Sequence, residues 1–203
     1  MPDRKDPALV HIVDDQAAMR KMVAELVESI SLKQRSYASA NEFLANYVPR
    51  PCECIVSDVR MPEIGGLEFF RILRERNHVA PVIFVTGFAE VGTAVDAMRD
   101  GAFDYIEKPF AHQLFLDKVQ RALAESAVRY LNEMKRRATE ARLAVLTPTE
   151  QRILKLVANG KSSREIGELM KISSRTVDNH RGHIMEKMHV NSVVELVLLA
   201  TGR

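Results

Sequence analysis

The chain has few cysteines and no long apolar segment, and each shortage excludes a class of protein. Its 203 residues include two cysteines and no tryptophan. No run of about 18 apolar residues is present, the length that a membrane-spanning helix needs. The segment from Met1 to Asp6 is charged and is therefore unlike the start of a secretory signal peptide. We expect a cytoplasmic protein with no membrane partner.

The two cysteines, Cys52 and Cys54, do not indicate a disulfide-stabilised protein. On a strand they would share one face at a separation of roughly 6.6 Å, near the upper limit for a disulfide. In a reducing compartment they are expected to be small apolar side chains with free thiols.

Charge is distributed unevenly. Residues 1–125 carry 15 basic and 19 acidic side chains, residues 126–142 carry 5 and 2, and residues 143–203 carry 9 and 6. An acidic first part and a basic last part indicate different partners, and the basic part is compatible with nucleic acid.

Short apolar runs alternate with amphipathic segments in the first part of the chain, which is typical of βα units around a parallel sheet. The pattern predicts an α/β fold with a five-stranded, parallel, doubly wound sheet of flavodoxin-like type. The predicted strands are Leu9–Val13, Lys33–Ser39, Cys54–Val56, Val82–Val85 and Phe103–Glu107. The predicted helices are Ala17–Ile30, Ala40–Tyr47, Leu67–Arg76, Val91–Arg99 and a segment that starts near Ala111.

The last of these helices is expected to continue as a linker. Glycine and proline are absent from Ala111 to Leu146, and apolar residues recur with a period near 3.5. If the chain is helical from Ala111 to Ala141, the helix is about 45 Å long. The repeat suits a single packed helix or a dimerising coiled coil, and it is too short to favour the coiled coil. The apolar positions are Leu116, Val119, Leu123, Ala127, Tyr130 and Met134.

Four short apolar-periodic segments follow, without a strand signal. Ser173 is a candidate N-cap for the third of them, Ser174–Met188, and Gly160 stands where a helix C-terminal glycine belongs. Four short helices, the middle two joined by a tight turn, suit an all-α helix-turn-helix domain. The predicted organisation is therefore a domain over 1–125, a helical linker over 126–142 and a domain over 143–203. Capping boxes are predicted at Ser39–Glu42, Thr147–Glu150 with Pro148 at the first helical position, Ser162–Glu165 and Ser192–Glu195.

Polar residues close the predicted strands, where ligands bind in open parallel sheets. They are Asp14 with Asp15, Asp58, Thr86 and Lys108. Three carboxylates repel one another unless a cation is present, and oxygen ligands favour Mg²⁺, which also accepts phosphate. A hydroxyl and an ammonium opposite them would hold phosphoryl oxygens. Singly, each residue has an ordinary explanation, such as a solvated loop, a helix cap or a surface charge. Together, in this order, they favour a site.

This set, with Asp58-Val59-Arg60-Met61-Pro62, Gly65-Gly66 and Lys108-Pro109-Phe110, resembles the CheY-like receiver family over residues 8–125. The resemblance implies that Asp58 accepts a phosphoryl group from a sensor histidine kinase. It implies that Mg²⁺ is ligated by Asp15, Asp58 and the backbone carbonyl of Arg60, with Asp14 acting through a metal-bound water. Thr86 and Lys108 would bind the phosphoryl group, Tyr105 would turn inward when Thr86 moves, and Lys108-Pro109 would be a cis peptide.

Residues 146–200 resemble the LuxR-type helix-turn-helix, and the whole chain resembles the FixJ/NarL class of response regulators. Two departures are Gly167, where the family usually has alanine, and Asp178, where many members have lysine. The glycine is expected to loosen its helix by about 1 kcal/mol relative to alanine. The matching residues are Leu146-Thr147, Glu150, Leu156-Val157-Ala158, Gly160, Lys161-Ser162, Glu165-Ile166, Ile172-Ser173, Thr176-Val177, His180, Ile184, Lys187-Met188, Val190 and Glu195-Leu196.

Helical geometry separates two faces of Ser174–Met188. Val177, Ile184 and Met188 share a face that should pack on the domain, and the opposite face can enter a major groove. An ordinary solvated face is the alternative, and His180 is expected to be a packed side chain because no cluster of metal ligands surrounds it. The candidate DNA contacts are Arg175, Thr176, Asp178, Asn179, Gly182, His183 and Lys187.

The resemblance therefore implies a transcriptional regulator, not an enzyme, that forms a homodimer on phosphorylation and acts at promoter DNA with RNA polymerase. One alternative is a Mg²⁺-dependent hydrolase with Asp58 as nucleophile, but Arg60 stands where such an enzyme needs a second acid. The other is a DNA-binding adaptor that does not respond to phosphorylation.

Overall fold

The structure, a computed structural model, describes residues 8–87 and 91–201. It divides into two compact units, Met1–Asn132 and Glu133–Arg203. The expectation for Met1 to Asp6 falls outside the described residues. Among the helices of the described part, none is long and apolar enough to cross a membrane.

The first unit is built on a five-stranded parallel sheet in the order β2-β1-β3-β4-β5, which confirms the predicted fold class. The bounds of four predicted strands were wrong. The second strand ends at Tyr37 because Ser39 caps the following helix, and the third is longer by a residue at each end. The fourth extends to Thr86, and the fifth begins one residue later, at Asp104. The strands are β1 (Leu9–Val13), β2 (Lys33–Tyr37), β3 (Glu53–Ser57), β4 (Val82–Thr86) and β5 (Asp104–Glu107).

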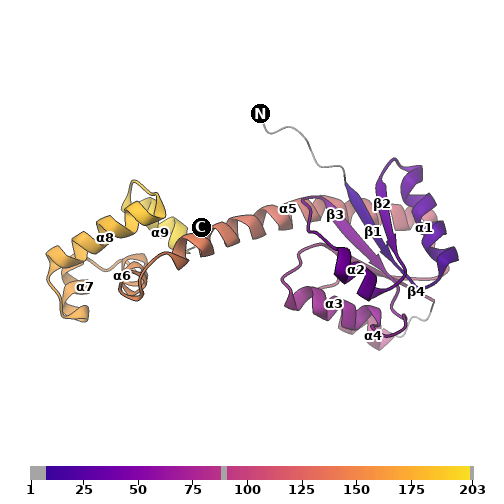
Figure 1. Cartoon of the computed structure of the whole chain (residues 1–203), viewed down its shortest axis with the longest axis horizontal. Coiled ribbons are helices and arrows are strands. Elements are labelled where there is room, and N and C mark those ends of the chain that lie inside the picture. Colours follow the sequence, from indigo (N-terminus) through magenta and orange to yellow (C-terminus); the bar gives the residue numbers. More distant parts are fainter. Residues whose placement is uncertain (1–7, 88–90, 202–203) are drawn as a thin grey trace. The chain divides into compact units, whose positions relative to one another are not determined.

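Helices cover both faces of this sheet, as Figure 1 shows. Val23 and Val27 of α1 and Phe115 and Val119 of α5 pack together against one face. On the other face α2, α3 and α4 enclose a second core that is rich in phenylalanine. The helices are α1 (Ala17–Ser29), α2 (Ala40–Asn46), α3 (Gly66–Glu75), α4 (Val91–Arg99) and α5 (His112–Ala144).

α5 is one helix of 33 residues, and the division between the two units falls within it, between Asn132 and Glu133. The predicted apolar stripe is buried at Leu116, Val119 and Leu123. Burial then decreases along the helix, and Met134 is exposed.

In the described part of the second unit, four helices follow the end of α5 and surround an aliphatic core. Its helices are α6 (Pro148–Ala158), α7 (Ser163–Met170), α8 (Ser174–Met188) and α9 (Val193–Thr201). Ile153, Ile166, Ile184 and Met188 are fully buried there. Residues 133–203 contain no phenylalanine, tyrosine or tryptophan, so all the aromatic side chains belong to the first unit.

Local hydrogen bonds explain where most helices begin. The reciprocal capping boxes predicted at Thr147 and Ser162 are present, Ser173 caps α8, and Gly160 ends the preceding helix with a φ of 77°. At Ser39 and Ser192 the boxes were only half right. Each serine accepts a hydrogen bond from the backbone three residues later, but Glu42 and Glu195 accept from the residue before the cap, Ala38 and Asn191.

A buried polar cluster lies on the α2 and α3 face of the sheet. His11 Nε2 lies 3.0 Å from Glu53 Oε2, and both side chains are 2% exposed. The hydroxyl of Tyr47 donates to the other carboxylate oxygen, and the backbone N–H of Arg50 also donates to it at 3.0 Å. Tyr37 Oη lies 3.3 Å from His11 Nδ1. Each oxygen of this buried carboxylate therefore has a partner, as burial of a charge requires.

Both cysteines are free thiols, as expected, and Cys54 is fully buried. Burial raises the pKa of the Cys54 thiol well above its usual value, so this side chain stays protonated.

Candidate functional site

Three of the predicted site residues meet at the carboxyl end of the sheet. Asp14 follows β1, Asp58 follows β3 and Lys108 follows β5, and the register aligns the ends of the first two strands, with Val13 opposite Ser57. Lys108 Nζ lies 3.1 Å from Asp14 Oδ2 and 2.9 Å from Asp58 Oδ1. The side chains of Lys108, Asp14 and Asp58 are 13%, 5% and 6% exposed. One ammonium therefore bridges two nearly buried carboxylates.

Asp14 is fixed through its side chain and its backbone. Oδ1 accepts a hydrogen bond from the backbone N–H of Gln16 at 2.8 Å, and the N–H of Asp14 donates to the carbonyl of Tyr37 at 3.3 Å. Burial raises the pKa of the Asp14 carboxyl above its ordinary value, while the Gln16 hydrogen bond and Lys108 act in the opposite direction.

Asp15 differs from its neighbour because it is exposed. Its carboxylate makes no hydrogen bond or ion pair with any of the residues that the structure describes. Its backbone carbonyl accepts a hydrogen bond from Arg20 Nη1 at 3.0 Å, and the same nitrogen donates to the carbonyl of Asp14 at 2.7 Å. Arg20 was not among the residues predicted from the sequence.

The loop after β3 holds Asp58 in a tight turn. The backbone N–H of Arg60 donates to Asp58 Oδ2 at 3.0 Å, and the N–H of Gly66 donates to the carbonyl of Val59 at 2.9 Å. Gly66 packs directly on this loop, because a Cβ atom there would lie 2.2 Å from the carbonyl oxygen of Asp58. The missing side chain of Gly66 thus allows the loop that carries Asp58, the candidate phosphoryl acceptor, to pack in this position.

Thr86 and Tyr105 occupy neighbouring strands. Thr86 is buried at the end of β4, and its carbonyl accepts a hydrogen bond from the backbone N–H of Lys108 at 2.8 Å. Tyr105 stands opposite Phe84 in the register, with 6.2 Å between the ring centroids, and is half-buried. The peptide between Lys108 and Pro109 is cis, as predicted.

The oxygen atoms at this edge suit a hard divalent cation. Asp14 and Asp58 already converge on one positive charge, that of Lys108, and Asp15 supplies an exposed carboxylate one residue away. Over the described ranges, 8–87 and 91–201, no three His, Cys, Asp or Glu side chains form a group that could hold a metal ion. Mg²⁺ needs only one or two protein carboxylates because it retains waters and takes phosphate oxygens, so the donor set fits Mg²⁺.

The second candidate site is the outward face of α8. Val177, Ile184 and Met188 are fully buried in the unit, as predicted, while Arg175, Asn179, Gly182 and His183 are exposed. The side chains of Arg175 and Asn179 make no hydrogen bond or ion pair within the described part of the chain. His180 is half-buried.

Three of the predicted DNA contacts, Lys187, Asp178 and Thr176, are engaged within the unit. Lys187 Nζ lies 2.9 and 2.8 Å from the two carboxylate oxygens of Glu150, which is buried at the start of α6. These hydrogen bonds lower the pKa of Glu150 to about 2. Asp178 accepts a hydrogen bond from Ser163 Oγ at 2.6 Å, and Arg181 donates to that same hydroxyl at 2.7 Å. Thr176 Oγ1 lies 2.7 Å from the hydroxyl of the cap, Ser173.

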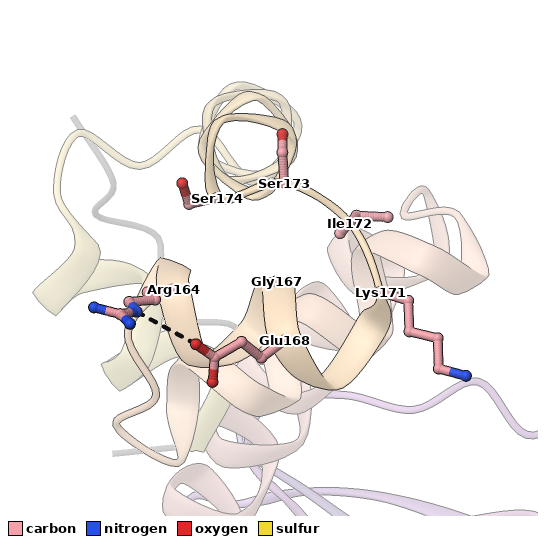
Figure 2. Close-up of a pocket in the computed structure, with 7 residues that line it drawn as sticks. All are labelled: Arg164, Gly167, Glu168, Lys171, Ile172, Ser173 and Ser174. Atoms are coloured by element: carbon pink, nitrogen blue, oxygen red, sulfur yellow. Dashed lines mark hydrogen bonds and ion pairs between the residues drawn. The ribbon is translucent and has the colours of Figure 1, made fainter.

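A shallow pocket lies beside the turn between α7 and α8, and Figure 2 shows its lining. Gly167 faces the backbone of this turn, and a Cβ atom there would lie 2.7 Å from the carbonyl oxygen of Ile172. The expected loosening of α7 relative to alanine stays a prediction, and the structure adds an opposing effect, because the missing side chain lets α7 contact the turn. Polar side chains of Arg164, Glu168, Lys171, Ser173 and Ser174 complete the lining.

Comparison with known proteins covers both units. A family model described as response regulator receiver domain matches residues 10–120, and one described as bacterial regulatory proteins, luxR family, matches residues 144–200. The transcriptional regulatory protein FixJ of Azorhizobium caulinodans is 39% identical over 191 residues, which are 94% of this chain and 90% of that protein.

Two solved structures are also similar over nearly the whole chain. The structure of the response regulator StyR has a TM-score of 0.74 and 30% sequence identity, and the match covers 97% of this chain and 100% of that one. Full-length FixJ from B. japonicum has a TM-score of 0.58 and 32% identity, with 96% of each chain covered.

Proposed function

The chain belongs to the response regulators of two-component systems, and from this premise we propose that phosphorylation of Asp58 controls its binding to promoter DNA. The family has a receiver domain, which implies a kinase partner, and a luxR-type domain, which binds DNA. The observation that supports the proposal most directly is that Lys108 bridges Asp14 and Asp58. The Asp58 carboxylate therefore has an ammonium beside it and a second carboxylate nearby.

The proposed reaction is a phosphoryl transfer from a phosphohistidine of a sensor kinase. A carboxylate oxygen of Asp58 forms the bond to phosphorus while the phosphorus–nitrogen bond of the phosphohistidine breaks. Lys108, 2.9 Å from Asp58 Oδ1, is placed to pair with phosphoryl oxygens, and Thr86 offers a hydroxyl at the same edge. Mg²⁺, held by Asp15, Asp58 and the carbonyl of Arg60 with Asp14 acting through water, would neutralise charge on the transferred group.

The acyl phosphate adds about two negative charges at the end of β3. Thr86 and Tyr105 are the proposed two-state element that reports this change, because they lie on adjacent strands beside the site. The active form is proposed to be a homodimer that binds promoter DNA in the cytoplasm and acts with RNA polymerase. A two-fold dimer implies two half-sites about one helical turn apart.

The assignment of Asp58 is tested with a small acyl phosphate donor and Mg²⁺, followed by intact mass. The wild-type chain should gain one phosphoryl group, and Asp58→Asn should gain none. Asp100→Asn is the matched control, because Asp100 is an exposed aspartate whose only ion pair among described residues, to Arg71, is 3.9 Å long. Equal phosphorylation of wild type and Asp58→Asn would exclude Asp58. DNA affinity that is independent of the donor would instead identify the adaptor alternative.

DNA recognition is assigned to the exposed face of α8. Asn179 carries the amide that can contact adenine through N6 and N7, and Arg175, near the helix start, is suited to phosphate. Asn179→Ala should cost about 1 to 3 kcal/mol and relax discrimination at one base position, while Arg175→Ala should weaken all sequences alike and reduce the salt slope by about one. Binding to single-base variants at two salt concentrations measures both. If Arg175→Ala lost discrimination between bases and Asn179→Ala kept it, the roles assigned to the two residues would be reversed.

A further inference from the structure

Arg20 links the first helix of the receiver unit to the acidic pair that precedes it. Its Nη1 atom donates to two backbone carbonyl oxygens, that of Asp14 at 2.7 Å and that of Asp15 at 3.0 Å. The side chain is half-buried, and a guanidinium keeps its proton at any relevant pH. Both hydrogen bonds are therefore charge-assisted, which makes them stronger than those between neutral groups.

The two aspartates depend on this contact to different degrees. The carboxylate of Asp14 accepts hydrogen bonds from the N–H of Gln16 and from Lys108. The backbone N–H of Asp14 donates to the carbonyl of Tyr37. The carboxylate of Asp15 has no partner in the described structure, so its direction follows from the backbone alone. Arg20 sets the orientation of that backbone, because it binds the carbonyl groups of both aspartates.

We propose that Arg20 is a positioning residue for Asp15, holding the loop between β1 and α1 so that the Asp15 carboxylate faces a divalent cation. The contacts of Arg20 are with the two backbone carbonyls, so it would act on the cation through the loop and not as a ligand. The inference rests on the proposed function, because it assumes that this edge binds Mg²⁺.

The test compares Mg²⁺ affinities measured by titration calorimetry on the full-length chain. Arg20→Met preserves the length of the side chain and removes both hydrogen bonds, and it should weaken Mg²⁺ binding about tenfold, the lower end for losing a group that orients a metal ligand. Arg20→Lys should recover most of the affinity, because an ammonium can also donate to both carbonyls. Lys21→Met is the control, since Lys21 is the next residue of α1 and its side chain is 78% exposed.

Two further measurements separate positioning from general stabilisation. Phosphorylation by a small acyl phosphate should reach the wild-type rate in Arg20→Met once Mg²⁺ is saturating, so only the Mg²⁺ concentration for half-maximal rate should change. In an Asp15→Asn background, Arg20→Met should have no additional effect on Mg²⁺ affinity, because it acts through Asp15.

Wild-type Mg²⁺ affinity in Arg20→Met would overturn the proposal, and so would an undiminished effect in the Asp15→Asn background. If Arg20→Met fails to fold, Arg20→Gln, measured alone and with Asp15→Asn, gives the same comparison. Absence of Mg²⁺ binding by the wild-type chain would count against the proposed function itself, which distinguishes the two failures.

Discussion

At the carbonyl group of Asp58, the packing leaves no space for a side chain at residue 66. A Cβ atom on Gly66 would meet that oxygen at 2.2 Å, whereas a Cβ atom on Gly65 would lie 3.4 Å from the carbonyl oxygen of Val59. The atoms in conflict with residue 66 belong to the backbone, so they cannot rotate away. The neighbouring glycines are therefore constrained very differently.

Gly66→Ala should lower the free energy of unfolding by about 1 to 3 kcal/mol through overpacking, and it should slow phosphorylation because the Asp58 loop must shift. Gly65→Ala should cost less than about 1 kcal/mol. Urea unfolding and the rate of phosphorylation by an acyl phosphate check both variants. Equal behaviour of the two alanines would show that the loop tolerates displacement.

Sequence reasoning identified Asp14, Asp58 and Lys108 as neighbours because strand ends in a parallel sheet meet at one edge. It could not identify the contacts of Arg20 or His11. Arg20 reads as one polar position on an amphipathic helix, and its bonds depend on how the preceding loop turns. His11 reads as a polar interruption in an apolar strand, and its partner, Glu53, is 42 residues away. Neither contact has a local sequence signal.

Among the elements, α7 packs closely against the start of α8 because residue 167 has no side chain. The Cβ position of Gly167 lies 2.7 Å from Ile172 O and 3.3 Å from Ser174 N. Gly182 on α8 offers the opposite case, with nothing within 4 Å of its Cβ position. Packing within the unit therefore requires glycine at residue 167 but not at residue 182.

Gly167→Ala should destabilise the second unit by about 1 to 3 kcal/mol. Gly182→Ala should stabilise it by about 0.5 to 1 kcal/mol, since alanine favours a helix interior. Chemical unfolding followed by far-ultraviolet circular dichroism measures both changes. If Gly182→Ala also weakens DNA binding while the fold is more stable, close approach of the DNA to this backbone is supported. A stabilising Gly167→Ala would contradict the packing argument.

The contact between α6 and α8 depends on pH through Glu150. Its pKa is about 2 in the folded unit, below the ordinary value, because Lys187 donates to its carboxylate. The unfolded state therefore binds the proton more readily, so the stabilisation is complete above the unfolded pKa, near 4.3, and is lost as pH falls through about 2.

Glu150→Gln should cost about 2 kcal/mol at pH 7, where the charged hydrogen bonds are intact. Its cost should be smaller at pH 3. Glu168→Gln is the control, because the pair of Glu168 with Arg164 is exposed and should contribute little at either pH. Unfolding measured at both pH values gives the difference, and a pH-independent cost for Glu150→Gln would contradict the assignment.

For the whole molecule, the sequence predicted the division into an α/β part and a helical part because the apolar period changes along the chain. It placed the linker at residues 126–142, a range that remains a prediction, whereas the compact units of the structure meet between residues 132 and 133. The difference arises because α5 continues without a break, and a regular helix carries no local mark of where packing on one core ends. Only tertiary contacts, such as the burial of Ser126 beside Glu53, define that point.

Limited trypsin digestion should cut the chain between residues 127 and 144 and leave two resistant fragments, since few buried contacts protect that part of α5. Glu133 stabilises this stretch by pairing with Arg136 at 2.8 Å and with Arg137 at 2.7 Å. Glu133→Gln should therefore accelerate cleavage, and Glu25→Gln on α1 should not. Cleavage confined to other regions would indicate a single tightly packed unit.

The placement of the aromatic side chains gives the intact protein a built-in optical label. All its tyrosines and phenylalanines precede residue 133, whereas the core of the second unit is aliphatic. Tyrosine emission and near-ultraviolet dichroism therefore report on the first unit alone, while far-ultraviolet dichroism reports helices in both units. Comparing these signals during one unfolding experiment resolves the two units without cutting the chain, and a single tryptophan introduced after residue 133 would observe the DNA-binding unit separately.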